Sequence, residues 1–259
     1  MAVLATPMRR LPAPRLTVLA PHADDAALSL GASLQRLAQA GVALTVVTCH
    51  TRSAWAPHHP RAREAEAVTR VRRREDARYA QLLGARLIEL GLDEAALRRP
   101  GLLVQRPTDG ADRAHGRALA RALACALADE RSDGGALMLV PLGIGEHVDH
   151  ALTRTAGLER ARRRPLAFYE DLPYAAWEGW PGVRAKVRAA ERLIGRRLHP
   201  LRLTTRFARA RQRAAACYPS QLSSRERRAL EAVVRARGGE LLWATRRMHA
   251  ALLQLAGSA

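Results

Sequence analysis

The sequence predicts an α/β fold with a mostly parallel central sheet, and three observations lead to that prediction. Strand, helix and strand follow one another within about thirty residues near the N-terminus, the βαβ arrangement of parallel sheets. Two short apolar runs, 16–20 and 136–140, have the uncharged character of buried inner strands. Each run ends at a proline and is followed at once by a cluster of His and Asp residues.

The first half of the chain carries the most regular alternation. Residues 1–14 contain three prolines and are expected to form a flexible leader before the first strand. A helix is expected to begin at Asp24 or Asp25, whose carboxylates suit a helix N-terminus, and to stop at Gly41. The other elements expected here are a strand at 42–49, a loop at 50–60, a helix at 62–83 and a strand at 86–90.

The second half is harder to assign, beginning with 91–112, which Gly and Pro interrupt. The elements expected after it are a helix at 114–128, a strand at 136–140, a helix from 150 to about 163, a strand at 166–169, a helix at 181–195, a strand at 197–205 and then mostly helix through 240–243. Because the sequence has neither an internal repeat nor a Ser/Gly linker, residues 1–259 are expected to form a single domain.

Composition limits the classes of function. Hydrophobic residues make up 48% and charged residues 26%, as in ordinary soluble globular proteins. The formal net charge of +19 raises the possibility of nucleic-acid or acidic-membrane binding. However, Lys186 is the sole lysine, the arginines are spread over many expected helices, and aromatic residues are only 4%, few for a base-stacking platform. A basic surface that attracts anionic substrates is therefore favoured over nucleic-acid binding.

The cysteines and the apolar runs bear on the compartment. Cys49, Cys125 and Cys217 are far apart and show no CxxC spacing, which indicates neither a disulfide framework nor a thiolate zinc site. The N-terminus makes a poor signal peptide, and no run reaches the roughly 18 apolar residues that a membrane span needs. We therefore expect a cytoplasmic protein without a membrane span; the sequence leaves the oligomeric state open.

The two His/Asp clusters carry the chemistry. Since ligands bind beyond the carboxyl ends of parallel strands, both clusters are expected at one edge of the sheet. His22, Asp25 and His150 provide two imidazoles and a carboxylate, a ligand set that lets a catalytic zinc keep a position for water. Asp24 and His147 remain for proton transfer and charge stabilisation. Either cluster alone could simply begin a helix, but their joint occurrence after strands and prolines favours a site.

These motifs resemble a known family. The segment Pro21-His22-Ala23-Asp24-Asp25, together with His147-Val148-Asp149-His150, is similar to the two motifs of the LmbE-like, or PIG-L, family of zinc-dependent N-deacetylases. The stretches 141–146, 169–174 and 218–221 also resemble a bacterial branch of that family. The resemblance implies a Rossmann-like, three-layer αβα fold with a mostly parallel central sheet. Ala23 and Ala26 depart from the usual Pro and Glu, but neither removes a proposed ligand.

The resemblance also implies a role for each motif residue. His22, Asp25 and His150 would bind one Zn²⁺ per chain, and Asp24 would be the general base for the attacking water. His147 would stabilise the oxyanion or protonate the leaving amine. The remaining catalytic candidate is Asp149, which would tune a neighbouring histidine.

Five further residues are predicted to contact substrate, with structural alternatives open. They are Arg52, Trp55, Glu170, Asp171 and Tyr174. The first two lie in the 50–60 loop and could equally decorate a surface; the last three follow a strand at the same sheet edge, where they could also orient other groups or form a turn.

The function expected from these observations is hydrolysis of an N-acetyl or other N-acyl group on an amino sugar or glycoconjugate. The absence of G-x-G-x-x-G after the first strand argues against dinucleotide binding, and the absence of G-x-S-x-G argues against a serine hydrolase. Two alternatives stay open: the same zinc chemistry on a non-sugar N-acyl natural product or thiol conjugate, and an anion- or nucleic-acid-binding protein.

Overall fold

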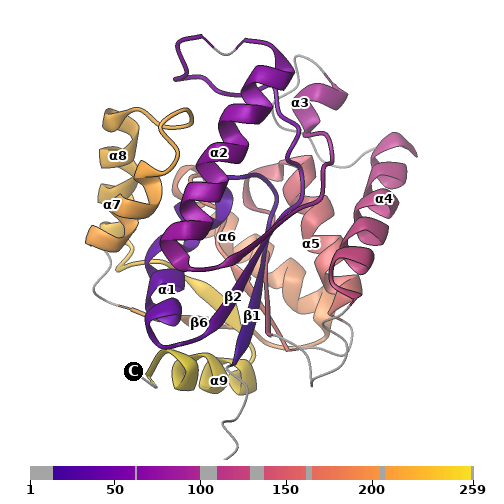
Figure 1. The fold of residues 1–259 in the computed structure, drawn as a ribbon. Helices are drawn as coiled ribbons and strands as arrows, with labels where there is room; N and C mark the ends of the chain where they lie inside the picture. Colours follow the sequence, from indigo (N-terminus) through magenta and orange to yellow (C-terminus); the bar gives the residue numbers. More distant parts are fainter. Residues whose placement is uncertain are drawn as a thin grey trace, which may run out of the picture.

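A computed structural model describes residues 14–61, 63–99, 110–128, 137–161, 165–204 and 208–257. Within these residues, helices surround one seven-stranded sheet with the strand order β3-β2-β1-β4-β5-β7-β6 (Figure 1). The strands are β1 (Arg15–Ala20), β2 (Ala43–Thr48), β3 (Arg86–Glu89), β4 (Leu137–Pro141), β5 (Leu166–Tyr169), β6 (His199–Leu201) and β7 (Leu242–Ala244). Strands β1 to β5 pair in parallel, whereas β7 and β6 add antiparallel. The prediction of a mostly parallel sheet is confirmed.

The two inner strands β1 and β4 lie at the switch in strand order. β1 pairs with β2 on one side and with β4 on the other. The next strand in sequence after β2 is β3, which lies on the far side of β2, so the chain returns past β1 to form β4. Both strands are almost wholly buried, which explains their continuous apolar sequences. Crevices at such switch points, outside the carboxyl ends of the strands, are the usual ligand sites of open α/β sheets.

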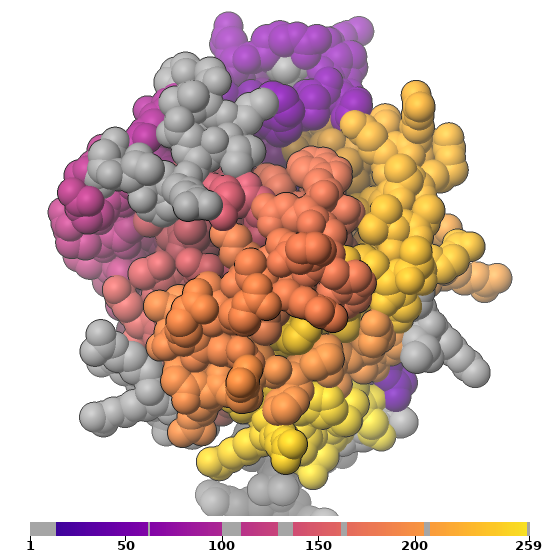
Figure 2. Space-filling model, turned by 180° about the vertical axis from the view of Figure 1, so that it is seen from behind, coloured from indigo at the N-terminus to yellow at the C-terminus, as the bar shows by residue number. Residues whose placement is uncertain are grey.

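Helices cover both faces of the sheet. The helices are α1 (Asp25–Gln39), α2 (Ala65–Leu83), α3 (Ala95–Arg98), α4 (Gly110–Ala126), α5 (Val148–Arg160), α6 (Tyr174–Ile194), α7 (Ala208–Ala216), α8 (Ser224–Ala236) and α9 (Arg246–Gly257), with a short 3₁₀ turn η2 (Ile144–Glu146). One core cluster packs α1, α2 and α9 on one face of the sheet, and a second packs α4, α5 and α6 on the other. Seen from behind, the orange region that includes α6 fills the middle of the surface (Figure 2). The expected three-layer αβα arrangement is confirmed.

Several expected boundaries were wrong, mostly in the C-terminal half. The helix expected at 181–195 begins at Tyr174, because a kink at Gly179 (φ 63°) joins an extra first segment to it. The strand expected at 197–205 is only the three-residue edge strand β6, and the segment 240–243, expected to be helical, contains the start of β7. Strand β7 pairs with β5, and β6 pairs with β7. Local sequence does not reveal such pairing, which gives both segments their strand conformation. The leader predicted for 1–14 lies outside the described residues except for Pro14.

No helix in the described part of the chain is long and apolar enough to cross a membrane.

Candidate metal centre

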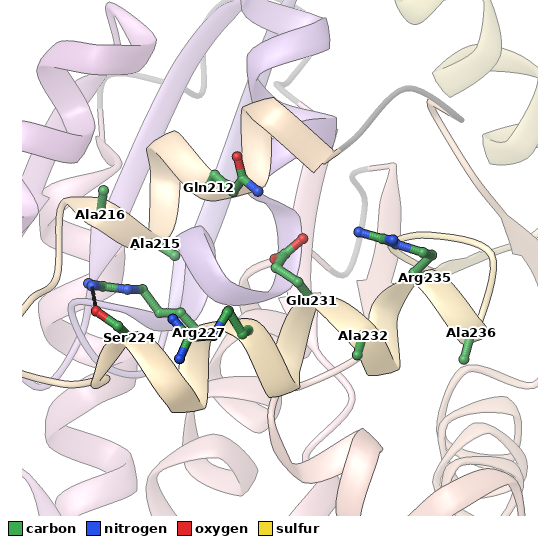
Figure 3. Close-up of a pocket in the computed structure, with 10 residues that line it drawn as sticks. Gln212, Ala215, Ala216, Ser224, Arg227, Glu231, Ala232, Arg235 and Ala236 are labelled. Atoms are coloured by element: carbon green, nitrogen blue, oxygen red, sulfur yellow. Dashed lines mark hydrogen bonds between the residues drawn. The ribbon is translucent and has the colours of Figure 1, made fainter.

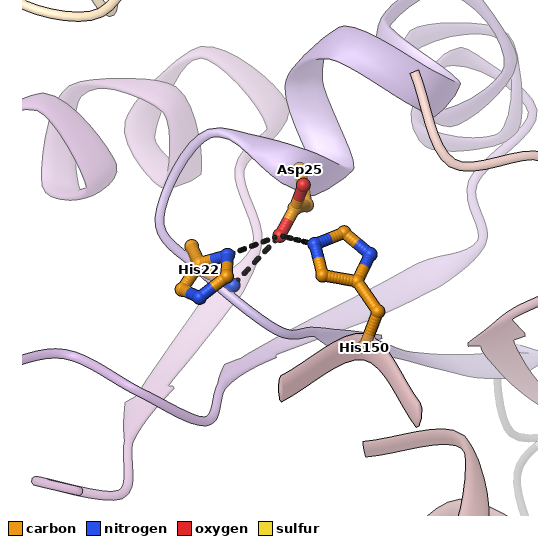
Figure 4. A group of neighbouring side chains, drawn as sticks. All are labelled: His22, Asp25 and His150. Atoms are coloured by element: carbon orange, nitrogen blue, oxygen red, sulfur yellow. Dashed lines mark hydrogen bonds and ion pairs between the residues drawn. The ribbon is translucent and has the colours of Figure 1, made fainter. Parts of the chain in front are cut away.

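His22, Asp25 and His150 meet at the carboxyl ends of β1 and β4 (Figure 4). His22 follows β1 after Pro21, Asp25 is the first residue of α1, and His150 lies in the first turn of α5. Asp25 Oδ2 lies 3.1 Å from His22 Nδ1 and 3.4 Å from His150 Nε2. The three ligand atoms lie within 4.8 Å of one another, as the predicted metal site requires.

The outward nitrogen of each histidine faces a second carboxylate. His22 Nε2 lies 3.0 Å from Asp149 Oδ2, and His150 Nδ1 lies 2.6 Å from Asp171 Oδ1. A carboxylate on one ring nitrogen fixes the tautomer and turns the lone pair of the other nitrogen towards a metal. His150 Nε2 is buried and has no hydrogen-bond partner among the described residues, so its lone pair is available. The residues therefore fit a divalent cation.

The charges of the centre also suit a cation. Burial by itself lowers the pKa of His22, but hydrogen bonds to Asp149 and Asp25 outweigh it and raise that pKa to about 10. Burial raises the pKa of Asp25, yet His150 and His22 together bring it below its ordinary value. In the protein alone, a proton on His22 balances these carboxylates; a bound metal ion would supply that positive charge instead.

A second group with metal-ligand spacing shares His22 with the first and adds His50 and Asp149. His50 is buried directly after β2, with Nδ1 3.1 Å from Pro21 O and Nε2 3.6 Å from Asp149 Oδ1. The Asp149 carboxylate also accepts from Ala95 N at 2.8 Å and from the Arg98 guanidinium at 2.7 Å. Because a guanidinium already neutralises Asp149, the first group is the better cation site. Sequence reasoning did not single out His50 or Arg98 as part of this network.

Asp24 lies beside the centre but contacts a different partner from Asp25. It occupies the N-cap position of α1, yet its side chain makes no capping hydrogen bond, so the simple helix-cap alternative is not what the structure has. Its Oδ1 accepts from Arg72 Nη2 at 2.7 Å. Arg72 projects from α2, is buried, and also donates to Gln221 Oε1 and Trp55 O. Sequence reasoning missed Arg72 because nothing local separates it from its neighbours Arg73 and Arg74.

His147 packs edge-on against His22, with 4.9 Å between ring centroids. It caps α5: its Nδ1 accepts from the backbone N–H of Asp149 at 3.2 Å. Burial lowers the pKa of His147 to about 2, with help from His22 and His150, so the ring is neutral. Since Nδ1 accepts a hydrogen bond, the proton of the neutral ring is on Nε2.

Three of the predicted substrate residues follow β5. Asp171 is buried; besides His150 Nδ1 it accepts from Ile144 N at 3.0 Å. Glu170 is also buried, and its oxygens accept from Arg237 and from Trp243 Nε1. Both carboxylates thus accept hydrogen bonds from other elements of the fold.

Tyr174, at the start of α6, lies against the centre. Its ring packs edge-on against His150 at a centroid distance of 5.2 Å and lies 6.3 Å from His147. Burial raises the pKa of its phenol, so it remains protonated and able to donate a hydrogen bond.

Arg52 and Trp55 are exposed in the loop after β2. Arg52 Nη1 pairs with Asp93 Oδ1 at 2.9 Å, and both side chains are exposed. Trp55 is 45% exposed, while its backbone carbonyl accepts from Arg72 and Gln221. Trp55 is therefore connected to the centre through Arg72 and Asp24. Arg52 is connected to Asp149 in a similar way, because its partner Asp93 accepts from Arg98 through the backbone carbonyl and Arg98 also donates to Asp149.

A groove of about 780 Å³ lies elsewhere, between α7 and α8 (Figure 3). It is lined by alanines of both helices and by charged side chains that include Arg227, Arg228 and Arg235. None of the predicted site residues lines this groove.

The fold and the centre together define an α/β protein with a His/Asp site for a metal at the carboxyl edge of a parallel sheet. Residues 17–161, more than half of the chain, match the family model described as PIG-L: GlcNAc-PI de-N-acetylase. The chain therefore belongs to the PIG-L family, and the resemblance drawn from the sequence motifs is confirmed.

Individual relatives agree with this assignment. The chain is similar to the 2'-N-acetylparomamine deacetylase of Streptomyces fradiae, with 35% identity over 195 residues that cover 71% of this chain and 66% of that protein. It thus spans slightly less than two thirds of that relative's length.

Solved structures share the fold along most of the chain. The A40926 pseudoaglycone deacetylase is 25% identical, with a TM-score of 0.63 over 91% of this chain and 98% of that one. A deacetylase of teicoplanin biosynthesis is 23% identical, with a TM-score of 0.63 over 88% and 96%.

Proposed function

We propose that this protein is a metal-dependent hydrolase that removes an N-acetyl group from an amino sugar or glycoconjugate. The observation that carries the proposal is the convergence of His22, Asp25 and His150, with Asp24 and His147 beside them, in a chain of the de-N-acetylase family. The relative named as an N-acetylparomamine deacetylase supports an amino sugar as the substrate class.

His22, Asp25 and His150 would hold the metal, and we propose one Zn²⁺ per chain. Two imidazoles and a carboxylate suit zinc, although iron also binds such sets. Bound there, zinc would supply Lewis acidity, polarising the amide carbonyl and lowering the pKa of water. Asp149 and Asp171 would act on the far side of the two histidines, orienting their rings.

Asp24 is assigned as the general base. Arg72 holds Oδ1, which sets the plane of the carboxylate, and Oδ2 would take the proton of the attacking water. A carboxylate held by a buried guanidinium keeps its position with little loss of entropy at each turnover.

His147 is assigned as the hydrogen-bond donor to the oxyanion. Its Nδ1 accepts a backbone N–H, so a second proton on that atom would break the α5 cap. The neutral ring with Nε2–H therefore suits stabilisation of the oxyanion better than protonation of the leaving amine.

The remaining predicted residues divide into two groups. We propose that Tyr174, which lies next to both histidines, and Trp55 contact the substrate. Glu170 instead would fix the loop between β5 and α6 to the C-terminal segment through Arg237 and Trp243. Arg52, paired to Asp93, is retained as a peripheral substrate contact, and a cytoplasmic location stays a prediction from the sequence.

Metal content and amine release test the proposal together. The purified protein should bind close to one zinc per chain and release amine from a panel of N-acetylated amino sugars. His22→Ala and His150→Ala should lose both metal and activity, while His58→Ala, an exposed histidine paired with Glu226, should keep both.

Asp24→Asn tests whether Asp24 acts as the general base or as a metal ligand. This variant should retain the metal but lose about a hundredfold or more in turnover, since the carboxamide cannot take a proton. Metal loss in Asp24→Asn, or full metal binding in His150→Ala, would contradict the assignment. Activity confined to N-acyl compounds without a sugar would favour the alternative substrate class.

A further inference from the structure

An exposed tryptophan lies next to the metal centre and has no place in the function described so far. All four tryptophans of the chain lie in the described residues. Trp177, on the first turns of α6, is 73% exposed, the most exposed large hydrophobic side chain among the described residues. Five other aromatic side chains are buried in the core, namely Tyr79, Phe168, Tyr169, Tyr218 and Trp243. A single exposed apolar side chain is ordinary in itself. What points to a binding role is the position of this indole in line with the rings of the metal centre.

A line of ring contacts joins Trp177 to the centre. The Trp177 ring packs edge-on against Tyr174, with 5.4 Å between ring centroids and 88° between the planes. The Tyr174 ring in turn packs edge-on against His150 at 5.2 Å. Trp177 therefore lies two ring contacts from a proposed metal ligand.

The segment that carries Trp177 is held firmly against the loop after β4. Glu178 Oε1 accepts from Gly145 N at 2.9 Å, Lys186 Nζ pairs with Glu146 Oε1 at 2.7 Å, and Asp171 Oδ2 accepts from Ile144 N at 3.0 Å. Three successive residues of η2 are thus each tied to α6 or to the residues before it. A side chain held in this way is pre-organised for binding.

Trp180 differs from Trp177 although it lies on the same helix. The guanidinium of Arg237 stacks over the Trp180 ring at 4.4 Å from the centroid, and Arg237 is itself bound to Glu170. This cation–π contact covers one face of the Trp180 ring and gives it a structural partner. The Trp177 ring, by contrast, makes an edge-to-face contact with Tyr174.

We propose that Trp177 and Tyr174 form a ledge that binds a second sugar ring of the substrate, next to the ring whose N-acetyl group lies at the metal centre. A pyranose has a face of C–H groups that packs on an indole, while its hydroxyls remain in water at the rim; an open ledge suits such a ligand. An alkyl chain would instead require an enclosed groove to leave water. This inference rests on the proposed function and extends it: the enzyme selects N-acetylated glycosides of two or more rings over monosaccharides.

Kinetics on matched substrates test the ledge. N-acetylglucosamine supplies one ring and N,N'-diacetylchitobiose supplies two. Trp177→Ala should lower kcat/KM for the two-ring substrate about tenfold, mainly through KM, and leave the one-ring value within about twofold. Trp177→Phe should restore most of the loss because it keeps an aromatic face. Leu193→Ala, which removes an exposed side chain (61%) from the far end of the same helix, should change neither.

Tryptophan fluorescence tests whether the two-ring substrate contacts Trp177, and it does not depend on hydrolysis. The two-ring compound should change the emission of the wild-type protein and of Leu193→Ala, and this change should be lost in Trp177→Ala. If Trp177→Ala lowers kcat/KM equally for both substrates, or changes it for neither, the ledge is overturned while the deacetylase function stands. If the wild-type protein hydrolyses neither compound nor any other N-acetylated sugar, the proposed function fails, and an absent fluorescence change then overturns the ledge as well.

Discussion

Asp24 and Asp25 are neighbours in the chain, but their side chains belong to different networks. Asp25 turns into the centre, where Oδ2 meets His22 and His150. Asp24 turns towards α2, where it meets Arg72. The start of a helix makes this possible, because successive side chains there leave the backbone about 100° apart. One residue can then bind a metal while the next stays free for proton transfer.

Replacing Arg72 tests how much the base depends on its partner. Arg72→Met should lower kcat by about tenfold or more with a smaller change in KM, because Asp24 loses the contact that sets its orientation. Steady-state kinetics together with zinc analysis measure this effect, and the metal content should stay unchanged. Arg73→Met is the matched control, since the adjacent Arg73 makes an exposed pair with Glu89. Equal kinetics in the two variants would show that Asp24 needs no such support.

At the scale of elements, the 3₁₀ turn η2 joins β4 to α5 and packs against α6. Gly145 has φ 86°, a conformation that side chains rarely adopt, and a Cβ there would lie 2.3 Å from the Tyr174 ring. Glu146 also has a positive φ, 59°, and immediately precedes His147. The close approach of Gly145 is therefore what lets Tyr174 lie against His150.

Gly145→Ala should disturb both stability and substrate binding. The added methyl group forces Tyr174 to move and strains the backbone, so the free energy of unfolding should fall by about 1–3 kcal/mol. Chemical denaturation gives that value, and KM for the amino sugar should rise in the same variant. Gly84→Ala, at a helix end with open space around it, separates backbone strain from the clash. A Gly145→Ala effect no larger than that of Gly84→Ala would argue against the contact with Tyr174.

Asp76 connects α2, the end of β2 and Tyr218. It accepts from Thr48 Oγ1 at 2.5 Å and from Tyr218 Oη at 2.8 Å. Burial raises the pKa of Asp76 from 3.8 to about 7, although these hydrogen bonds act in the opposite direction. Between about pH 4 and pH 7 the folded protein therefore holds a proton that the unfolded chain has released.

This shift predicts the direction of a pH effect on stability. Because the folded pKa is the higher one, the contribution of Asp76 is full below about pH 4 and is lost as pH rises towards 7, by at most about 1.4 kcal/mol per pH unit. Denaturation of Asp76→Asn and wild type at pH 4.5, 6 and 7.5 measures it: the variant should gain stability relative to wild type as pH rises. A constant difference across that range would show that Asp76 does not titrate there.

At the scale of the whole molecule, a buried carboxylate links the C-terminal third to the first helix. Glu240 accepts from the backbone N–H groups of Ala32 and Ser33 on α1, at 2.9 and 2.8 Å. It also pairs with Arg211 of α7 at 2.6 Å, and both side chains are fully buried. These contacts, together with the strand β7 in the common sheet, support the proposal that the chain folds as one domain.

Glu240→Ala should lower the stability of the entire protein. Removing Glu240 takes one of two carboxylates from the buried Arg211 guanidinium, which keeps its pair with Glu231. It also leaves two backbone N–H groups of α1 without their acceptor, and the total cost should be about 3 kcal/mol. Calorimetry should show a single transition in wild type and variant, displaced to lower temperature in the variant. Glu66→Ala, which breaks an exposed pair with Arg70, should change the stability by less than about 1 kcal/mol. Two separate transitions, with only one displaced, would mean that the C-terminal third unfolds independently.

Two sequence motifs were enough to reveal the family resemblance. The parallel sheet and the meeting of His22, Asp25 and His150 could also be predicted before the structure. Those features follow from local patterns: apolar runs form inner strands, and residues just after parallel strands share one edge of the sheet. The partners of the site residues, such as Arg72 for Asp24 and Asp171 for His150, became known from the folded chain alone. The same is true of strand β7, where helix was expected. The physical reason is that such contacts join residues far apart in the chain, so their energy depends on packing that no local pattern encodes.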